Sequence, residues 1–313
     1  ELNMKPVKNI TIIGNGLMGC GCALVFAQNT DFNVTVKHRS GTRETIHERI
    51  MSFMVPLIEK GIYSQAEAEA IIGRVHTEMD LAESVKDADL VMECIAENMQ
   101  LKQDQFAALE PLTRPDTIYA TNTSVMSITA IASKTVKKDR VVGTHFWNPP
   151  YLIPLVEVVK ASETSEDTME RTLDCLLRAG KKAIRCNKDV PGFVANRMQH
   201  ALWREAISIV AHGIADAATV DEAVRSSFGL RLPVLGPMEN ADMVGTDLTL
   251  SIHEYMLQHL ESDSKPSPIL YEKVAAGELG FKTQKGFQEW NDEKIAESRR
   301  KLSEHLIKML YDK

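Results

Sequence analysis

The amino-acid sequence predicts an α/β protein with a doubly wound, mainly parallel sheet, followed by an all-α C-terminal domain. Two observations carry this prediction. From Val7 onward, short β-branched runs alternate with longer helical patterns, as in parallel strands joined by helical crossovers. After Pro191-Gly192, which interrupts the pattern, no strand-like run follows. We therefore expect a sheet domain over residues 5–188 and a helical domain over residues 189–313.

Seven short runs are expected to form the strands of the sheet. They are rich in β-branched residues and are followed by turn or helical patterns. The runs cover residues 9–13, 33–38, 90–95, 117–120, 140–144, 155–159 and 183–186. Between the second and third lies an insertion of residues 43–88, whose Glu- and Ala-rich pattern predicts a helical hairpin with a turn near Gly61. We expect this arm to project from the sheet rather than to extend it.

The C-terminal part has helical patterns. Leu202, Ala206, Ile209 and Val210 recur at helical spacing, and residues 292–313 form a charged stretch with an apolar stripe, as in a surface or interface helix. A helix-only domain packed on one sheet edge leaves apolar faces to cover. We therefore expect a homodimer that associates through the helical domain.

Composition and charge limit the class of protein. The chain has 313 residues, of which 44% are hydrophobic, and a formal net charge of −7. Nucleic acids and anionic membrane surfaces both require a clustered positive field, which this sequence lacks. No apolar run approaches the length of a membrane span, no signal-peptide profile is present, and the five cysteines form no CxxC pair. We expect a cytoplasmic protein with no bound metal, no nucleic-acid partner and no membrane partner.

A glycine-rich turn lies between the first strand and the first helix. Its residues are Gly14, Asn15, Gly16, Leu17, Met18 and Gly19. Glycine permits a tight turn and a close approach of the backbone to a diphosphate, which then lies at the helix N-terminus. Because a strand precedes the turn and a helix follows it, we interpret it as the nucleotide-binding turn of a Rossmann-type domain rather than as a purely structural turn.

The end of the second strand bears on the choice of cofactor. An acidic residue there would accept hydrogen bonds from the ribose of NAD, whereas a nearby arginine accommodates the 2′-phosphate of NADP. This chain has Lys37, His38 and Arg39 at that place and no acid. The three side chains could be only a solvated strand end, but their position favours NADP over NAD.

A histidine and a glutamate occur near the predicted carboxyl edge of the sheet, where open α/β folds bind ligands. They are His145 and, twelve residues later, Glu157. Oxidation of an alcohol by hydride transfer requires removal of the hydroxyl proton, and imidazole suits that task near neutral pH. A carboxylate beside the ring would orient it. Taken singly, His145 could be a structural residue and Glu157 could bond only to backbone.

Five segments in this order resemble the L-3-hydroxyacyl-CoA dehydrogenase family, over about residues 7–290. They are CIAEN at 94–98, TNTS at 121–124, HFWNP at 145–149, LVEVV at 155–159 and DVPGFVANR at 189–197. The resemblance implies a dimeric oxidoreductase of fatty acid metabolism. Such an enzyme interconverts a 3-hydroxyacyl substrate and its 3-keto form with NAD or NADP.

The resemblance also implies roles for individual residues. His145 would be the general base and Glu157 its partner, while Ser124 and Asn196 would hold the substrate oxygen and the imidazole ring. Cofactor contacts are implied for Glu97, Lys102, Asn122, Asn148 and Lys282. Taken alone, Ser124 could be a strand-end turn, Asn196 a helix-start contact and Lys282 a solvated lysine.

Departures from the family pattern leave the substrate open. Trp147 stands where a typical acyl-CoA member has phenylalanine, and Pro149-Pro150 is similar to relatives that act on free hydroxy acids, namely carnitine, gulonate and pyridine-carboxylate dehydrogenases. The arm has more acidic than basic residues, whereas a surface for the phosphates of CoA should offer Lys and Arg. We expect a 3-hydroxyacyl-CoA such as 3-hydroxybutyryl-CoA, with a free hydroxy acid as the alternative. A non-catalytic crystallin-like protein or a dinucleotide sensor is the alternative of another class.

Overall fold

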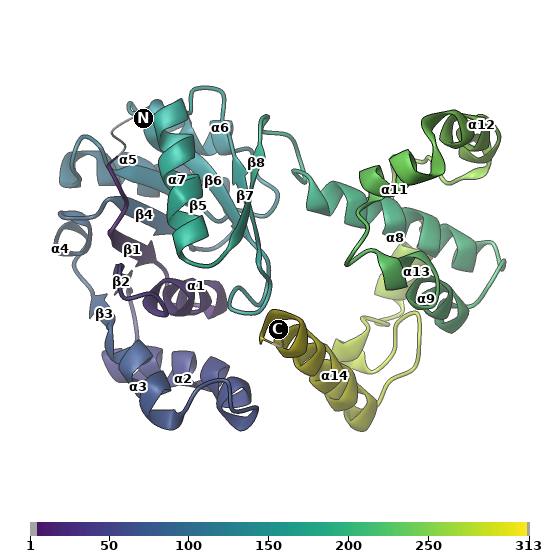
Figure 1. Ribbon diagram of the computed structural model, residues 1–313, viewed down its shortest axis with the longest axis horizontal. Coiled ribbons are helices and arrows are strands. Elements are labelled where there is room, and N and C mark those ends of the chain that lie inside the picture. The colour runs from purple at the N-terminus through teal and green to yellow at the C-terminus, as the bar shows by residue number, and fades with distance from the viewer. Residues whose placement is uncertain (1–4, 312–313) are drawn as a thin grey trace. The chain divides into compact units, whose positions relative to one another are not determined.

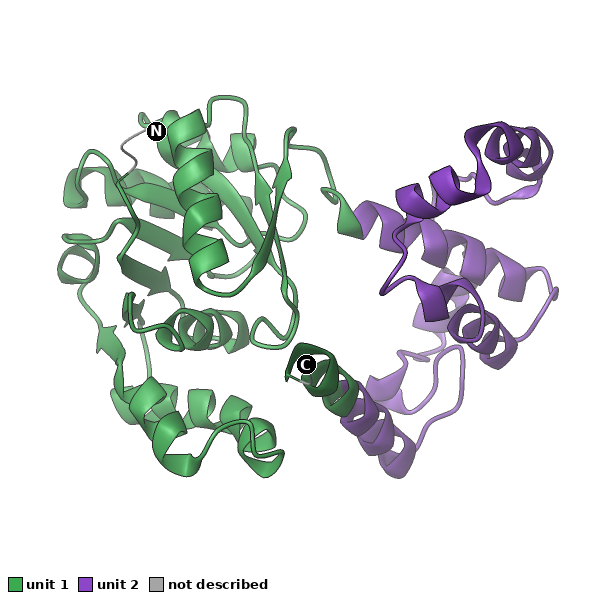
Figure 2. Cartoon of the chain, viewed as in Figure 1, with its two compact units in different colours: residues 1–195, 303–313 green, residues 196–302 purple. Residues whose placement is uncertain are grey.

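The computed structural model describes residues 5–311, which divide into two compact units. Of these residues, the first unit comprises 5–195 and 303–311, and the second comprises 196–302 (Figure 2). The first is an α/β unit and the second is helical, so the predicted fold class is confirmed. The division falls after residue 195 rather than after the predicted residue 188, and the end of the chain belongs with the first unit.

Eight strands form one sheet in the order β3-β2-β1-β4-β5-β6-β7-β8 (Figure 1). The strands are β1 (Asn9–Ile13), β2 (Asn33–Lys37), β3 (Val75–Glu78), β4 (Leu90–Glu93), β5 (Ile118–Thr121), β6 (Val141–Phe146), β7 (Leu155–Val159) and β8 (Lys182–Cys186). All neighbours are parallel except β6 and β7, which are antiparallel. The order reverses at β1, between β2 and β4. Open α/β sheets bind ligands at the carboxyl ends of the strands beside such a reversal.

Helices cover both faces of the sheet and bury two apolar clusters. One cluster joins Ile12 of β1 to the helices α1 (Leu17–Ala27), α2 (Arg43–Glu59), α3 (Gln65–Gly73) and α7 (Glu166–Arg178). The other joins Ile13 of β1 to α4 (Leu81–Val85), α5 (Met99–Leu109) and α6 (Ile128–Ile131). Three short 3-10 helices complete this unit, namely η1 (Glu110–Leu112), η2 (Ala132–Lys134) and η3 (Lys138–Arg140).

The inserted arm differs in part from the prediction. Helices α2 (Arg43–Glu59) and α3 (Gln65–Gly73) form the expected hairpin, and capping boxes at Thr42 and Ser64 start them. Strand β3 follows and pairs in parallel with β2, so the expectation that the arm would not extend the sheet was wrong. Val75 is the only buried residue of this four-residue edge strand, which leaves too weak an alternation to be recognised in the sequence.

The second unit is built from helices. They are α8 (Ala195–Ala211), α9 (Ala217–Arg225), α10 (Phe228–Arg231), α11 (Pro237–Val244), α12 (Thr246–Met256), α13 (Pro268–Ala275) and α14 (Asp292–Tyr311), with the 3-10 helices η4 (Leu257–His259) and η5 (Phe281–Thr283). No residue of α8 to α13 is buried. Within residues 5–311, no helix combines the length and apolarity needed to cross a membrane.

The predicted amphipathic helix α14 begins in the second unit and ends in the first. Ile307 is buried in the cluster that contains Ile12, and Leu306 packs against that cluster. The rings of Tyr311 and Tyr63 meet edge to face at a centroid distance of 6.3 Å. Residues 303–311 therefore complete the core of the sheet unit.

Candidate active site

The glycine turn after β1 leaves open space only at its middle glycine. A Cβ atom on Gly14 would lie 2.5 Å from the carbonyl oxygen of Cys94, and one on Gly19 would lie 2.0 Å from the carbonyl oxygen of Gly14. A Cβ on Gly16 would meet no atom within 4 Å. Packing therefore requires glycine at positions 14 and 19. At Gly16 the space is free, and the amides of Leu17 and Met18 start α1 beside it. A diphosphate fits such a space at the N-terminus of a helix.

The three basic side chains at the end of β2 differ in their exposure to solvent. His38 is buried, and its Nδ1 lies 3.2 Å from the carbonyl oxygen of Ser40, whereas Arg39 is exposed. A further basic group that the sequence did not indicate lies nearby. Arg49 of α2 donates a hydrogen bond to the carbonyl oxygen of Asn15 in the glycine turn. Nothing local in the sequence connects the arm to this turn, so Arg49 could be found only in three dimensions.

Glu97 and Lys102 belong to an ion-pair network at the ends of β4 and β5, in which Lys102 and Glu93 are buried and Glu97 is exposed. Lys102 Nζ lies 2.7 Å from Glu93 Oε1 and 3.2 Å from Glu97 Oε2, and its side chain is 1% exposed. Glu97 Oε1 accepts hydrogen bonds from Thr123 Oγ1 and from the amide of Ser124 at 3.1 Å. Burial raises the pKa of Glu97, but Thr123 and Lys102 outweigh it and hold that pKa below its usual value. Direct contacts of Glu97 and Lys102 with the cofactor stay predictions.

The predicted catalytic pair is brought together by the antiparallel pairing of β6 and β7, in which His145 lies directly opposite Glu157. His145 Nδ1 and Glu157 Oε2 are 2.7 Å apart, and both side chains are buried. An ionised carboxylate only accepts hydrogen bonds, so Nδ1 is the donor. The other nitrogen, Nε2, is then the one available to take a proton from a substrate.

Glu157 accepts three further hydrogen bonds. Its Oε1 accepts from the amides of Val194 and Ala195, each at 2.9 Å, and its Oε2 accepts from Trp147 Nε1 at 3.4 Å. Burial raises the pKa of Glu157, but the bonds from His145 and from these two amides outweigh it, and the pKa lies below its usual value. The side chain therefore stays charged at neutral pH although it is fully buried.

The loop between β6 and β7 is held by a residue that the sequence did not indicate. Lys181 is buried, and its Nζ donates to the carbonyl oxygen of Ile153 at 3.0 Å and to that of Pro150. Burial lowers the pKa of Lys181 to about 8. The exposed Asn148 lies in this loop, and its peptide bond to Pro149 is cis.

The remaining predicted residues fall into two groups. Asn122 Oδ1 accepts a hydrogen bond from the amide of Phe146 at 2.9 Å and so joins the ends of β5 and β6, and Ser124 is exposed just beyond β5. Asn196 on α8 and the exposed Lys282 on η5 belong to the second unit. The roles of these four residues stay predictions. Within residues 5–311, no cluster of side chains has the make-up of a metal site.

Comparison with known proteins identifies the family. A model of the NAD binding domain of 3-hydroxyacyl-CoA dehydrogenase matches residues 9–190, and a model of the C-terminal domain of that enzyme matches residues 192–290. The chain belongs to the 3-hydroxyacyl-CoA dehydrogenase family. The family predicted from the five segments is thereby confirmed. The chain is an NAD-dependent oxidoreductase that acts on a CH–OH group.

Three relatives show how far the similarity extends. A probable 3-hydroxybutyryl-CoA dehydrogenase of Deinococcus radiodurans is 37% identical over 284 residues, covering 89% of this chain and 99% of the relative. The crystal structure of 5-formyl-3-hydroxy-2-methylpyridine 4-carboxylic acid 5-dehydrogenase, an NAD+-dependent dismutase, matches with a TM-score of 0.87 at 30% identity, covering 97% of this chain and 98% of that one. The (S)-3-hydroxybutyryl-CoA dehydrogenase of Ralstonia eutropha matches with a TM-score of 0.76 at 30% identity, covering 91% of this chain and all of that one.

Replacement of Gly16 by alanine tests the free space at the glycine turn. We expect Gly16→Ala to fold normally and to bind NADH about ten-fold more weakly or worse, because the methyl group enters the space of the diphosphate. NADH fluorescence titration and the melting temperature measure the two properties. Gly73→Ala is the matched control, since a Cβ there also meets no atom within 4 Å. Equal NADH affinity in both variants would contradict the assignment.

The depressed pKa of Glu157 predicts a pH-dependent loss of stability in Glu157→Gln. The charged carboxylate stabilises the folded state fully above its usual pKa of 4.5, and this contribution disappears as the pH falls through the lower pKa of the folded state. We therefore expect the variant to be less stable than the parent by about 1–3 kcal/mol at pH 7, with a smaller difference below pH 4. Urea unfolding at both pH values measures this. Glu83→Gln, at an exposed ion pair, is the control and should change stability by less than about 1 kcal/mol; a pH-independent loss in Glu157→Gln would refute the prediction.

Proposed function

We propose that this chain interconverts a short 3-hydroxyacyl-CoA, such as 3-hydroxybutyryl-CoA, and its 3-keto form. The observation that carries the proposal is the buried His145–Glu157 pair, with Nδ1 committed to the carboxylate and Nε2 free for a substrate proton. The family relation supports a nicotinamide cofactor, and the open space at Gly16 beside the start of α1 fits its diphosphate. The similarity to the Deinococcus radiodurans relative supports the thioester.

In the oxidative direction, His145 Nε2 takes the proton of the substrate hydroxyl as the carbon–oxygen double bond forms. A nicotinamide cofactor held at the glycine turn would supply the acceptor for the hydride that leaves the same carbon. Glu157 stabilises the imidazolium that results, and its own low pKa keeps the proton on the ring. Ser124 and Asn196 are proposed to hold the substrate oxygen in reach of Nε2. In the reductive direction His145 returns the proton.

A second candidate substrate is a free hydroxy acid. The match to the pyridine carboxylic acid dehydrogenase, with a TM-score of 0.87 over 97% of this chain, favours a free acid over a CoA thioester. The acidic balance of the arm points the same way, because phosphates of CoA are bound by Lys and Arg. The reaction at the carbinol carbon and the role of His145 are the same for both candidates.

Rates with paired substrates decide between the candidates. We expect 3-hydroxybutyryl-CoA to be oxidised faster than 3-hydroxybutyrate, carnitine or gulonate, with reduced cofactor followed by absorbance.

In His145→Gln, kcat should fall by about 100-fold or more without a change in the cofactor Kd, because only the base is removed. His253→Gln, at an exposed position of α12, is the control. A thioester rate no higher than those of the free acids would establish the second candidate, and cofactor binding without any turnover would establish a dinucleotide sensor.

We propose that NADP serves at least as well as NAD. The exposed guanidinium of Arg39 follows β2, and Arg49 reaches the glycine turn, so the adenosine side of the turn is basic. Arginine forms charge-assisted hydrogen bonds to phosphate. We expect Arg39→Ala to weaken NADPH by about ten-fold and to leave NADH within about two-fold. Arg43→Ala, also exposed, is the control; failure of the unmodified protein to bind NADPH would rule out this preference.

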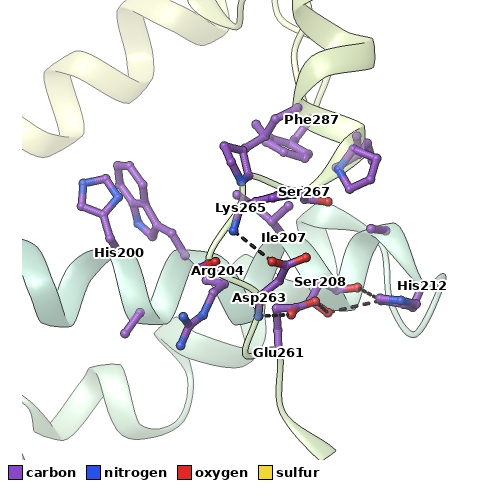
Figure 3. A pocket seen from close by; sticks show the side chains of 18 of the residues that line it. His200, Arg204, Ile207, Ser208, His212, Glu261, Asp263, Lys265, Ser267 and Phe287 are labelled. Atoms are coloured by element: carbon purple, nitrogen blue, oxygen red, sulfur yellow. Dashed lines mark hydrogen bonds between the residues drawn. The ribbon is translucent and has the colours of Figure 1, made fainter.

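We also propose a homodimer formed through the helical unit. Helices α8 to α13 have no buried residue, and large apolar side chains such as Leu230 of α10, 75% exposed, lie on their surface. A groove of about 1210 Å³ runs along α8 opposite residues 261–270, with Trp203 and Phe287 among its lining residues (Figure 3). It carries both signs of charge, as in Arg204 and Asp263, which suits pairing of identical surfaces. Light scattering that gives a monomer mass would refute the dimer.

We propose that, apart from a second copy of the chain, the protein binds only small molecules. We also propose that it is located in the cytoplasm. The five cysteines are all free thiols, and four of them are buried. Unpaired thiols suit a reducing compartment. The net charge of −7 disfavours nucleic acid as a partner.

A further inference from the structure

The segment between β8 and α8 has an unusual backbone. Gly192 and Phe193 are both in the left-handed region, with φ of 80° and 50°. Glycine adopts this conformation freely, but for an aromatic residue it is sterically unfavourable. Within residues 5–311, Phe193 and Gln284 are the two residues other than glycine with positive φ. A bulky residue is kept in such a conformation when its surroundings enforce it.

The left-handed turn directs two amides onto the catalytic carboxylate. The amides of Val194 and Ala195, which follow Phe193, each lie 2.9 Å from Glu157 Oε1. Successive amides after a left-handed residue form a concave site for an anion, and here they also start the 17-residue helix α8. Because Glu157 is fully buried, this oxygen depends on protein donors. The backbone at 192–193 thus determines how the partner of His145 is held.

The side chain of Phe193 lies against the imidazole itself. Its ring is 3% exposed, and its centroid is 5.6 Å from that of His145 at an interplanar angle of 57°. Trp147 lies against the same imidazole at 5.7 Å and 55°. Two aromatic rings therefore confine the imidazole, while Glu157 holds its Nδ1. Confinement limits rotation of the ring and keeps water from it.

We propose that Phe193 is a positioning residue for the general base, with its backbone holding Glu157 and its ring holding the imidazole of His145. The inference rests on the proposed role of His145. A residue that only filled the core would not need a left-handed backbone, and a residue that only turned the chain would be glycine. Phe193 combines the strained turn with a ring at the base, and each part can be altered separately.

Two variants separate the ring from the backbone. Phe193→Leu keeps most of the apolar volume but removes the ring, whereas Gly192→Ala opposes the left-handed turn and keeps the ring. We expect each to lower kcat by about ten-fold or more while the cofactor Kd changes by less than about two-fold. In Phe193→Leu the acidic limb of the pH profile of kcat should also move to higher pH, because water then stabilises the imidazolium. Gly61→Ala, at φ of 70° on the arm with no atom within 4 Å of a Cβ, controls for the backbone penalty alone.

A double-mutant cycle distinguishes positioning from general loss of structure. If Gly192→Ala acts through the amides that bind Glu157, its effect on kcat should largely disappear in the Glu157→Gln background. Additive effects on kcat, or kcat and pH profiles in Phe193→Leu and Gly192→Ala equal to those of Gly61→Ala, would overturn the inference. Turnover that survives in His145→Gln would instead overturn the proposed base, so the two failures differ. A variant that does not fold at 25 °C is replaced by Phe193→Met or Gly192→Ser, for which the same results are expected.

Discussion

Glu157 is fully buried and charged, so its oxygens must find donors inside the protein. Those donors come from three places in the chain: the end of β6, the loop after it, and the start of α8. Their convergence requires that β7 run antiparallel to β6, because only that pairing sets His145 opposite Glu157. The antiparallel pairing of β6 with β7, in a sheet whose other pairs are parallel, is thus the constraint on which the candidate active site depends.

A second buried carboxylate, Glu93, shows why the choice of partner decides the chemistry. Its partner is Lys102, at 2.7 Å, in a network that ties β4 and β5 to α5. The side chain of Lys102 bridges Glu93 and Glu97, so this network joins the end of β4 to α5. At His145 the carboxylate instead holds one nitrogen of an imidazole ring, and the second ring nitrogen is left for a substrate proton. In the sheet, β5 separates the strand of Glu93, β4, from the strand of His145, β6.

Local patterns in the sequence were sufficient to predict the elements whose structure depends on neighbouring residues. The glycine turn, seven of the strands and the helical hairpin were predictable because each follows from periodicity or from backbone conformation. The antiparallel β7 was also within reach, since the eight residues 147–154 are too few for a parallel crossover. Contacts such as those of Arg49 and Lys181 were not, because their partners lie more than 25 positions away. An apolar stripe on residues 292–311 shows that a partner surface exists without showing which surface it is.

The return of α14 to the first unit has a consequence for biosynthesis. Ile307 belongs to the same core as β1, so the apolar patch that it covers stays exposed while the ribosome is still adding the helical unit. Domains made first usually fold first during translation. Here, however, the core of the sheet unit includes a segment that is synthesised after the helical unit. A ribosome that stalls before residue 303 would leave a sheet unit with an uncovered core, the type of surface that chaperones bind. The core of the sheet unit is therefore complete only after the helical unit has been synthesised.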